Sequence, residues 1–282
     1  MLLAMTIVNS MFNFLHTFHP SPILISLGPI NIYWYGVSIV LGILSAIAVA
    51  IYLAKPYNLK PETIIDLAAW LIIGGLVGAR LYDIGLEWQY YSAQPLDILK
   101  VWQGGLAIHG AIIGGLIALW LYAKKYQQNF WQLAAIVATS LPLAQAVGRW
   151  GNYFNQELFG YPANLPWGIP IDLIHRPFGY LNFEYFQPTF LYESLGNLII
   201  FIILIFFHFH KRATSYELQV TSYLFMYSSL RFTTEFFRLD ATPVIFGLRF
   251  PQLISLLIII FCLIYFIVKF SRKISQNTAL EK

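Results

Sequence analysis

The 282-residue sequence has little charge, since Asp, Glu, Lys and Arg together make up only 11% of it. Soluble globular chains average about 25% charged and roughly 45–50% apolar residues. Here 58% of the residues are apolar, 17% are aromatic, and the mean hydropathy is +0.64. The sequence therefore predicts an integral membrane protein, and the same figures exclude a disordered or collagen-like chain.

Cysteine is nearly absent as well, because Cys262 is the single one in the sequence. It cannot form an internal disulfide, and its apolar surroundings indicate a packing role. The sequence has no two-cysteine zinc spacing, no nucleotide-binding glycine loop and no nucleophile elbow, so we expect no metal and no other cofactor. Residues 1–20 contain neither Lys nor Arg, and we do not expect them to be a cleaved signal peptide.

Seven segments are long and apolar enough to cross a bilayer, which takes about 20 residues in a helix. Unbroken apolar runs without strict alternation favour helices over barrel strands. We expect an all-α fold, a polytopic membrane helix bundle with about seven transmembrane helices that forms one domain over residues 1–282. The expected spans are 33–54, 64–84, 106–123, 131–149, 190–208, 219–237 and 251–268.

Two pairs of glycines in these spans are each separated by about one helical turn. They are Gly74 with Gly78 and Gly110 with Gly114. Small residues at this spacing predict close backbone contact between neighbouring helices.

The positive charges predict the orientation of the chain. The net charge is +4, which could indicate nucleic acid binding in a soluble protein, but here the basic residues lie mainly between apolar runs, and we expect no nucleic acid partner. By the positive-inside rule, the connections and the tail that hold ten of the 17 basic residues are cytoplasmic. The N-terminus and the loops 85–105, 150–189 and 238–250 then face outward. The ten residues are Lys55, Lys60, Lys124, Lys125, Lys211, Arg212, Lys269, Arg272, Lys273 and Lys282.

With that orientation, nearly every polar group in or beside the spans falls in one layer near the outer face. Ionisable residues at this depth are costly, so they usually face a wet cavity and mark a site. The sequence therefore predicts a polar cavity near the outer leaflet that holds a ligand. The groups are Tyr35, Arg80, Asp83, His109, Arg149, Tyr192, Glu193, Arg231, Glu235 and Arg238.

The sixth expected span carries a polar row at spacings of four, four and three residues, which predicts one helical face. It consists of Tyr227, Arg231, Glu235 and Arg238. For Glu235 we favour the simple interpretation, an Arg–Glu pair that makes the charges tolerable in lipid, because a carboxylate between two guanidinium groups orients them. For the arginines we favour a functional role. The surplus positive charge of the arginines would match a phosphate, which guanidinium groups bind bidentately.

The densest polar stretch is GRWGNYFNQELFG, residues 148–160, directly after an apolar span. We expect the backbone to turn back here and to present amides and side chains to a ligand. A helix C-cap at Gly148 or Gly151 would explain a glycine alone. It would not explain the polar side chains, which are Arg149, Asn152, Asn155 and Glu157.

Two further features allow two interpretations each. His109 lies among small residues, where a lone histidine is more often a packing residue, although its depth and its ordinary pKa of about 6.5 suit a proton acceptor at neutral pH.

The loop 161–189 is rich in proline and aromatic residues. It is expected to be either a stiff, lipid-facing cover over the cavity or an interfacial anchor.

The stretch GRWGNYFNQELFG resembles the signature of the bacterial prolipoprotein diacylglyceryl transferases. WYG at 34–36, HG at 109–110, QPTFLYE at 187–193 and YSSLRFTTEFFR at 227–238 resemble further motifs of this family, in the same order, so the likeness covers essentially the whole chain. It implies transfer of the diacylglyceryl group from phosphatidylglycerol to the lipobox cysteine of a prolipoprotein. The implied partners are phosphatidylglycerol, prolipoprotein signal segments and membrane lipid. The implied place is the bacterial plasma (inner) membrane, with the N-terminus outside and the C-terminus cytoplasmic.

The resemblance also implies a role for each matching residue. Arg149 and Asn152 would bind the lipid headgroup, and Asn155 and Gly160 belong to the same motif. Arg231 would hold the leaving phosphate, Glu157 and Glu235 would orient these groups, and Tyr35 and Tyr227 would be hydrogen-bonding partners. His109 is the candidate general base, because alkylation needs the thiolate and a free cysteine has a pKa of about 8.5.

Two other classes of protein could use an outer polar cavity. A transporter or channel could pass an anion through it, but such proteins often show internal repeats or broken helices near the midplane, and neither is clear here. A non-catalytic lipid-binding scaffold would bind the same headgroup without forming a product. The one-sided placement of the polar groups favours an enzyme.

Overall fold

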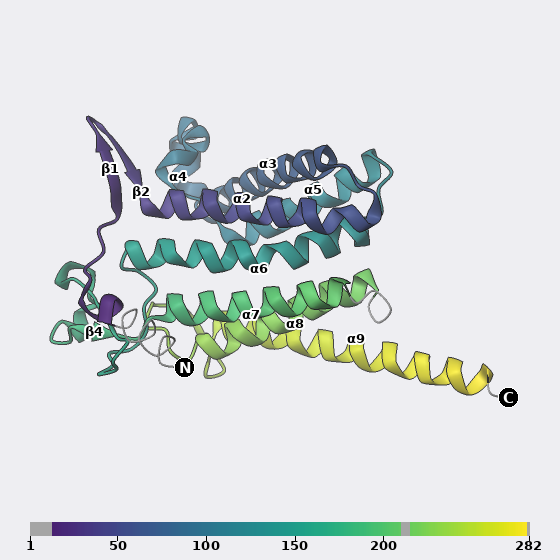
Figure 1. The fold of residues 1–282 in the computed structure, drawn as a ribbon. Coiled ribbons are helices and arrows are strands. Elements are labelled where there is room, and N and C mark those ends of the chain that lie inside the picture. The colour runs from purple at the N-terminus through teal and green to yellow at the C-terminus, as the bar shows by residue number, and fades with distance from the viewer. Residues whose placement is uncertain (1–12, 210–214, 281–282) are drawn as a thin grey trace. The chain divides into compact units, whose positions relative to one another are not determined.

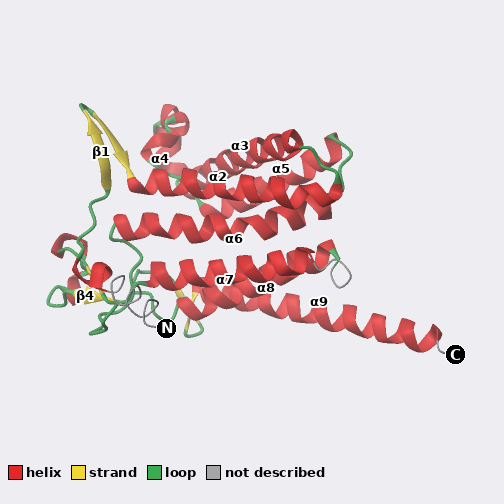
Figure 2. Cartoon of the chain, in the orientation of Figure 1, coloured by secondary structure: helices red, strands yellow, loops and turns green. Residues whose placement is uncertain are grey.

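The computed structural model describes residues 13–209 and 215–280, with side chains described as far as Ser271. It is mostly helical, and each of the seven expected segments is helical over most of its length (Figures 1 and 2). Residues 33, 106–107 and 235–237 of these segments lie outside the helices. Of the basic residues used to predict orientation, Lys211, Arg212 and Lys282 lie outside the described residues. The long helices are α2 (Trp34–Ala54), α3 (Pro61–Leu86), α5 (Ile108–Lys125), α6 (Phe130–Phe154), α7 (Thr189–Phe209), α8 (Tyr216–Thr234) and α9 (Phe250–Leu280), and a short α4 covers Trp88–Ala93.

Five helices in the described part of the chain are long and apolar enough to cross a membrane. The expected number of about seven is not confirmed by this measure, because α5 and α8 fall short of it. Helix α5 has 18 residues and ends on two lysines, and α8 carries Glu217 and Arg231. The five candidate spans are Trp34–Tyr57, Pro61–Leu86, Phe130–Phe154, Thr189–Phe209 and Phe250–Ser271.

Three small antiparallel hairpins accompany the helices, and the all-α prediction did not include them. The strands of the last two pairs have two residues each, which is too short to produce a period of two in the sequence. The pairs are β1 (Ile23–Leu27) with β2 (Ile30–Tyr33), β3 (Ile169–Pro170) with β4 (Tyr185–Phe186), and β5 (Val244–Ile245) with β6 (Leu248–Arg249).

The chain divides into two compact units, which are described separately. The first unit comprises residues 1–46 and 139–282, and the second unit comprises residues 47–138. The boundaries fall inside α2 and α6.

In the second unit, α3 and α5 pack backbone against backbone through the two glycine pairs. A Cβ atom added to Gly110 would lie 2.2 Å from the carbonyl oxygen of Gly78, and one added to Gly114 would lie 2.2 Å from that of Gly74. No side chain fits at these separations, so the predicted close contact is confirmed.

The same unit uses Arg80 to hold the segment that follows α4. Its Nε donates to the carbonyl of Ile98 at 2.9 Å, and its Nη1 donates to those of Gly104 and Gly105 at 2.8 and 2.9 Å. Nη2 donates to the carbonyl of Asp97, and Tyr91 accepts another bond from Nη1 at 2.8 Å. All three nitrogens therefore bind the chain itself, which explains the buried charge without a ligand.

In the first unit, α8 packs against both α7 and α9 (Figure 1). The region from Phe159 to Leu191 forms a small apolar core of its own together with residues of α6 and the N-terminal segment. Buried members are Leu15, Tyr153, Phe159, Ile169, Ile171, Phe186, Phe190 and Leu191. This core fixes the segments that carry the polar residues described next.

Candidate functional site

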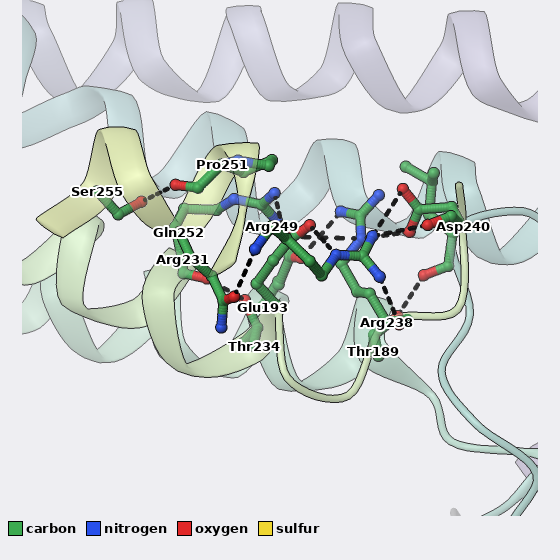
Figure 3. Close-up of polar contacts among 12 residues, drawn as sticks. Thr189, Glu193, Arg231, Thr234, Arg238, Asp240, Arg249, Pro251, Gln252 and Ser255 are labelled. Carbon is green, nitrogen blue, oxygen red and sulfur yellow. Dashed lines mark hydrogen bonds and ion pairs between the residues drawn. The ribbon is translucent and has the colours of Figure 1, made fainter. Parts of the chain in front are cut away.

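A cluster of four arginines and three carboxylates lies in the first unit, on α6, α7, α8 and the connection between α8 and α9. Figure 3 labels Glu193, Arg231, Arg238, Asp240 and Arg249 of this cluster. We call it the ion-pair cluster. Its arginines are Arg149, Arg231, Arg238 and Arg249, and its carboxylates are Glu193, Glu235 and Asp240.

Glu193 on α7 joins three of the arginines. Its Oε1 accepts a hydrogen bond from Nη1 of Arg231 at 2.6 Å and one from Nη1 of Arg238 at 3.4 Å, and its Oε2 forms an ion pair with Nη2 of Arg149. The Glu193 side chain is only 3% exposed. Arg149 and Arg231, which lie far apart in the sequence, are thus brought to one carboxylate.

Glu235 also contacts three arginines, of which Arg231 and Arg238 are shared with Glu193 and Arg249 is not. Its Oε2 accepts from Nη2 of Arg231 at 2.8 Å and lies 3.9 Å from Nε of Arg238, while its Oε1 accepts from Nε of Arg249 at 3.0 Å. The expected place of Glu235 between Arg231 and Arg238 is confirmed, although one of the two contacts is long. The prediction that the polar row from Tyr227 to Arg238 lies on one helical face is wrong in part. Helix α8 ends at Thr234, and Arg238 lies in the connection that follows.

Asp240 completes the cluster. It accepts from Nε of Arg238 at 2.7 Å and lies 3.3 Å from Nη2 of Arg249. Burial would raise the pKa of Asp240, but the hydrogen bond from Arg238 and the charges of Arg238 and Arg249 together hold it below its ordinary value.

The cluster has four positive and three negative groups and therefore a net charge of +1. Arg149 and Arg231 keep the most exposure of the three arginines that contact Glu193, at 21% and 15% against 7% for Arg238. A partly buried site with one unmatched positive charge favours a monoanion, and guanidinium groups suit phosphate oxygens in particular.

The polar stretch 148–160 is helical over its first half, in contrast to the expectation of a turn after Arg149. Helix α6 continues to Phe154, and neither Gly148 nor Gly151 has a positive φ, so the C-cap interpretation is also wrong. Two residues of the stretch lie in the left-handed region, Gln156 with φ of 49° and Leu158 with φ of 55°, and Gln156 is the first after the helix. A residue in this conformation ends a helix, which accounts for the longer α6.

Gln156 is held in that conformation by its side chain. Its amide donates to the carbonyl of Pro20 at 3.1 Å and to Oδ2 of Asp172 at 2.7 Å, and its Oε1 accepts from the Asp172 amide at 2.7 Å. The hydrogen bond from Gln156, followed by one from His19, holds the pKa of Asp172 below its ordinary value. These contacts fix the turn that carries the next residue, Glu157.

The Glu157 carboxylate contacts α6 through the side-chain amide of Asn152. Asn152 donates to Oε1 of Glu157 at 2.7 Å and accepts from Nη1 of Arg149 at 3.4 Å. This arrangement links Glu157 to the ion-pair cluster, so the orienting contact expected for Glu157 passes through Asn152.

Gly160 lies where the end of this stretch runs beside the segment after α8. Its amide donates to the carbonyl of Gln187 at 2.9 Å, and it forms an antiparallel bridge with Arg238. A Cβ atom here would lie 2.5 Å from the carbonyl oxygen of Phe237. Glycine is needed because two backbones approach closely, and its contribution is to position Arg238.

Tyr35 and Asn155 line a groove of about 720 Å³ on the first unit. The rest of its wall is mainly apolar, with Val37, Val40 and Leu41 from α2. The Tyr35 ring lies against Gly151, where a Cβ atom would come within 2.8 Å of it. The groove has the shape and polarity to accept an apolar chain beside a polar end group.

Tyr227 and His109 have aromatic neighbours. Tyr227 stacks on Tyr223 within α8, with ring centres 5.7 Å apart. His109 is exposed at the start of α5 in the second unit, with its ring 5.8 Å from that of Tyr82. No group of three His, Cys, Asp or Glu side chains in the described part of the chain is placed to hold a metal ion.

Four members of the cluster, Glu193, Arg238, Asp240 and Arg249, were not among the predicted site residues. Glu193 and Arg238 were placed in the polar layer without a role, and their positions in QPTFLYE and YSSLRFTTEFFR could have indicated one. Arg249 had no local signal, because its partners lie 9 to 14 residues away and the chain reaches them through the β5–β6 hairpin.

The sequence model of the family described as prolipoprotein diacylglyceryl transferase matches residues 22–268. The chain belongs to this family. It is 45% identical over 241 residues to the phosphatidylglycerol–prolipoprotein diacylglyceryl transferase of Nostoc sp., which covers 84% of this chain and 85% of that protein. It is 43% identical over 248 residues to that of Synechococcus elongatus, covering 86% and 85% of the two chains. It is 37% identical over 245 residues to that of Synechocystis sp., covering 86% of each.

The region matched to the diacylglyceryl transferase family contains the whole ion-pair cluster, the groove beside Tyr35 and the exposed His109. Family membership therefore covers both units and every residue predicted to act on substrate.

Proposed function

We propose that this chain is a membrane transferase that moves the diacylglyceryl group of phosphatidylglycerol to the lipobox cysteine of prolipoproteins. The cysteine sulfur forms a bond to the terminal glycerol carbon, the bond from that carbon to the phosphate oxygen breaks, and glycerol phosphate leaves with the electron pair. The observation that carries the proposal is the identity of 37–45% to transferases of this name over most of the chain.

The ion-pair cluster supports the choice of donor. A phosphodiester carries one negative charge, which matches the net charge of the cluster. Arg149 and Arg231 bind the headgroup and the phosphate in this proposal. As the carbon–oxygen bond breaks, a second charge develops on the phosphate, and fixed guanidinium donors stabilise it at little cost in reorganisation.

Each of the remaining residues has a role in the proposed reaction. Asn152 and Glu157 orient Arg149, as the hydrogen bonds that link the three indicate, and Glu235 orients Arg231. Tyr35 and Asn155 line the groove that accepts an acyl chain or the precursor's signal segment, and Tyr227 is a further hydrogen-bonding group. His109 takes the thiol proton, and Gly160 keeps the backbones close enough to place Arg238.

The proposed topology has seven membrane-spanning helices in the bacterial plasma membrane, the five apolar ones together with α5 and α8. Charged and polar residues in α5 and α8 are tolerated when they face protein rather than lipid. The N-terminus and residues 150–189 face outward, and the C-terminus is cytoplasmic, as the basic residues predict.

The test uses the purified full chain in vesicles that contain phosphatidylglycerol, with a precursor peptide that carries a lipobox cysteine. The peptide should gain the mass of one diacylglyceryl group, and a peptide with serine in place of the cysteine should gain none. Absence of product with the folded protein and both substrates would refute the proposal.

Two variants separate the roles within the reaction. Arg149→Ala should remove transfer while the protein remains folded, because Arg231 and Arg238 still contact Glu193. His109→Gln should lower the transfer rate most over roughly pH 6–9, where imidazole and thiol titrate. Unchanged turnover in the first variant would contradict the headgroup role, and an unchanged rate in the second would contradict the base assignment.

A further inference from the structure

Arg249 is the one arginine of the ion-pair cluster that contacts neither Glu193 nor the α6 stretch. Its Nε donates to Oε1 of Glu235 at 3.0 Å, and its Nη1 donates to the carbonyl of Arg238 at 2.8 Å. Its Nη2 donates to the carbonyl of Asp240 at 2.7 Å and lies 3.3 Å from that residue's Oδ2. All three nitrogens are thus bound to the protein (Figure 3).

We propose that Arg249 is a positioning residue of the transferase, which holds Glu235 so that Glu235 aims Arg231 at the lipid phosphate. The inference rests on the proposed function and adds to it a residue that does not touch the substrate.

The two oxygens of Glu235 carry this argument. Oε1 binds Arg249 and Oε2 binds Arg231, so the carboxylate is held from both sides and cannot rotate without breaking one of the bonds. The Glu235 side chain is 1% exposed, which leaves no water to replace a lost partner. When Arg249 is removed, Oε1 loses its donor, and the carboxylate can turn towards Arg238, whose Nε already lies 3.9 Å from Oε2.

The β5–β6 hairpin before α9 positions Arg249 beside Glu235. Strands β5 and β6 pair Val244 with Arg249 across a two-residue turn in which Phe246 and Gly247 both have positive φ, 53° and 78°. This is the geometry of the tight turns that fit the twist of a hairpin. A further bond from the Arg249 amide to Oε1 of Gln252, at 3.0 Å, ties the strand to the first turn of α9.

Arg249 also supplies charge, and this effect has to be separated from positioning. Without Arg249 the ion-pair cluster contains three positive and three negative groups, and the surplus charge that matches a phosphodiester is lost. Arg249→Lys keeps the charge, but a lysine cannot reach Glu235, Asp240 and two carbonyl groups with the fixed geometry of a guanidinium.

The first experiment measures the kinetics of Arg249→Lys in vesicles that contain phosphatidylglycerol. We expect kcat/KM for the lipid to fall about tenfold or more, the scale set by losing one charged hydrogen bond. The KM for the precursor peptide should not change. Arg176→Lys is the matched control, because Arg176 also binds backbone carbonyls, those of Ile171 and Leu181, and should retain full activity. Kinetics of Arg249→Lys equal to those of the unsubstituted protein would overturn the proposal.

The second experiment restores the charge without the geometry. The double variant Arg249→Met with Asp240→Asn has three arginines and two carboxylates in the ion-pair cluster, again a net charge of +1. The proposal predicts that it remains about tenfold or more impaired. Recovery of the original kcat/KM would mean that charge alone explains Arg249, and would overturn the positioning role.

The third experiment tests the path through Arg231. In an Arg231→Lys background, Arg249→Lys should cause little further loss, because residues that act through one another are not additive. A full additional tenfold loss would overturn the proposal. All variants are compared as folded protein with matching unfolding temperatures. If the unsubstituted chain forms no thioether product, the proposed function itself has failed, which is distinct from normal activity in Arg249→Lys.

Discussion

Replacing Glu193 by glutamine tests how the three arginines around it are held together. Glutamine has nearly the same shape and keeps one acceptor oxygen, but it removes the negative charge that Arg149, Arg231 and Arg238 share. The net charge of the ion-pair cluster then rises from +1 to +2 in a place where Glu193 is 3% exposed. We therefore expect the variant to be less stable than the unsubstituted protein and to be stabilised more by a bound anion.

The magnitude follows from the burial of the ion pairs. Removal of one partner of a buried pair costs about 3–5 kcal/mol. Because the amide oxygen can still accept a bond from Arg231, we expect the lower end, about 3 kcal/mol. A phosphodiester that binds in place of the carboxylate would compensate, since a ligand at about 100 times its Kd stabilises a protein by about 2.7 kcal/mol.

The assay is thermal unfolding in non-ionic detergent micelles, with phosphatidylglycerol or zwitterionic phosphatidylcholine added. Glu193→Gln should unfold at a lower temperature than the unsubstituted protein, and phosphatidylglycerol should raise this temperature more in the variant. Glu184→Gln removes an exposed carboxylate of the same unit and is the matched control. Equal unfolding temperatures for Glu193→Gln and the unsubstituted protein, or equal responses to phosphatidylglycerol, would refute the reasoning.

Three further predictions concern the supporting structure. Gly160→Ala should cost about 1–3 kcal/mol of stability and reduce transfer, since its Cβ would lie 2.5 Å from the Phe237 carbonyl oxygen; unchanged unfolding and activity would contradict the close approach. The pKa of Asp240 is lower in the folded protein, so its ion pairs stabilise the fold above about pH 4 and are lost as the pH falls through the folded-state value. The stability difference between the unsubstituted protein and Asp240→Asn should therefore close on acidification, and a constant difference from pH 7 to 3 would argue against these pairs. Gly110→Val should separate α3 from α5 and lower the unfolding temperature, whereas Gly115→Val, which has open space at its Cβ, should not; equal effects would contradict backbone contact at Gly110.

The helices were the most predictable part of the fold. A run of about 20 apolar residues specifies a helix by composition alone, and all seven expected segments are helical over most of their length. Their ends were less predictable, because they depend on contacts from distant parts of the chain. Helix α6 runs on to Phe154 because the first left-handed residue after it is Gln156, whose bonds reach Pro20 and Asp172.

Those residues of the candidate site that belong to a local sequence motif could be predicted. The motif of α6 and the motif of α8 identified Arg149 and Arg231 as candidates, and the structure brings both to Glu193. Arg249 follows a hairpin too short to leave a pattern, and its partners become visible only when the chain is folded. The partners of Arg80 also become visible only in the folded chain. Its depth in the expected span suggested a ligand site, but its hydrogen bonds go to backbone carbonyls.

The role of Arg80 bears on the order in which the second unit is completed during synthesis. The carbonyls of Asp97, Ile98, Gly104 and Gly105 converge on this one guanidinium, so α3 provides the contact that gathers the segment that contains them. Arg80 leaves the ribosome before that segment does. The nascent chain therefore already carries the anchor when the residues that wrap around it emerge.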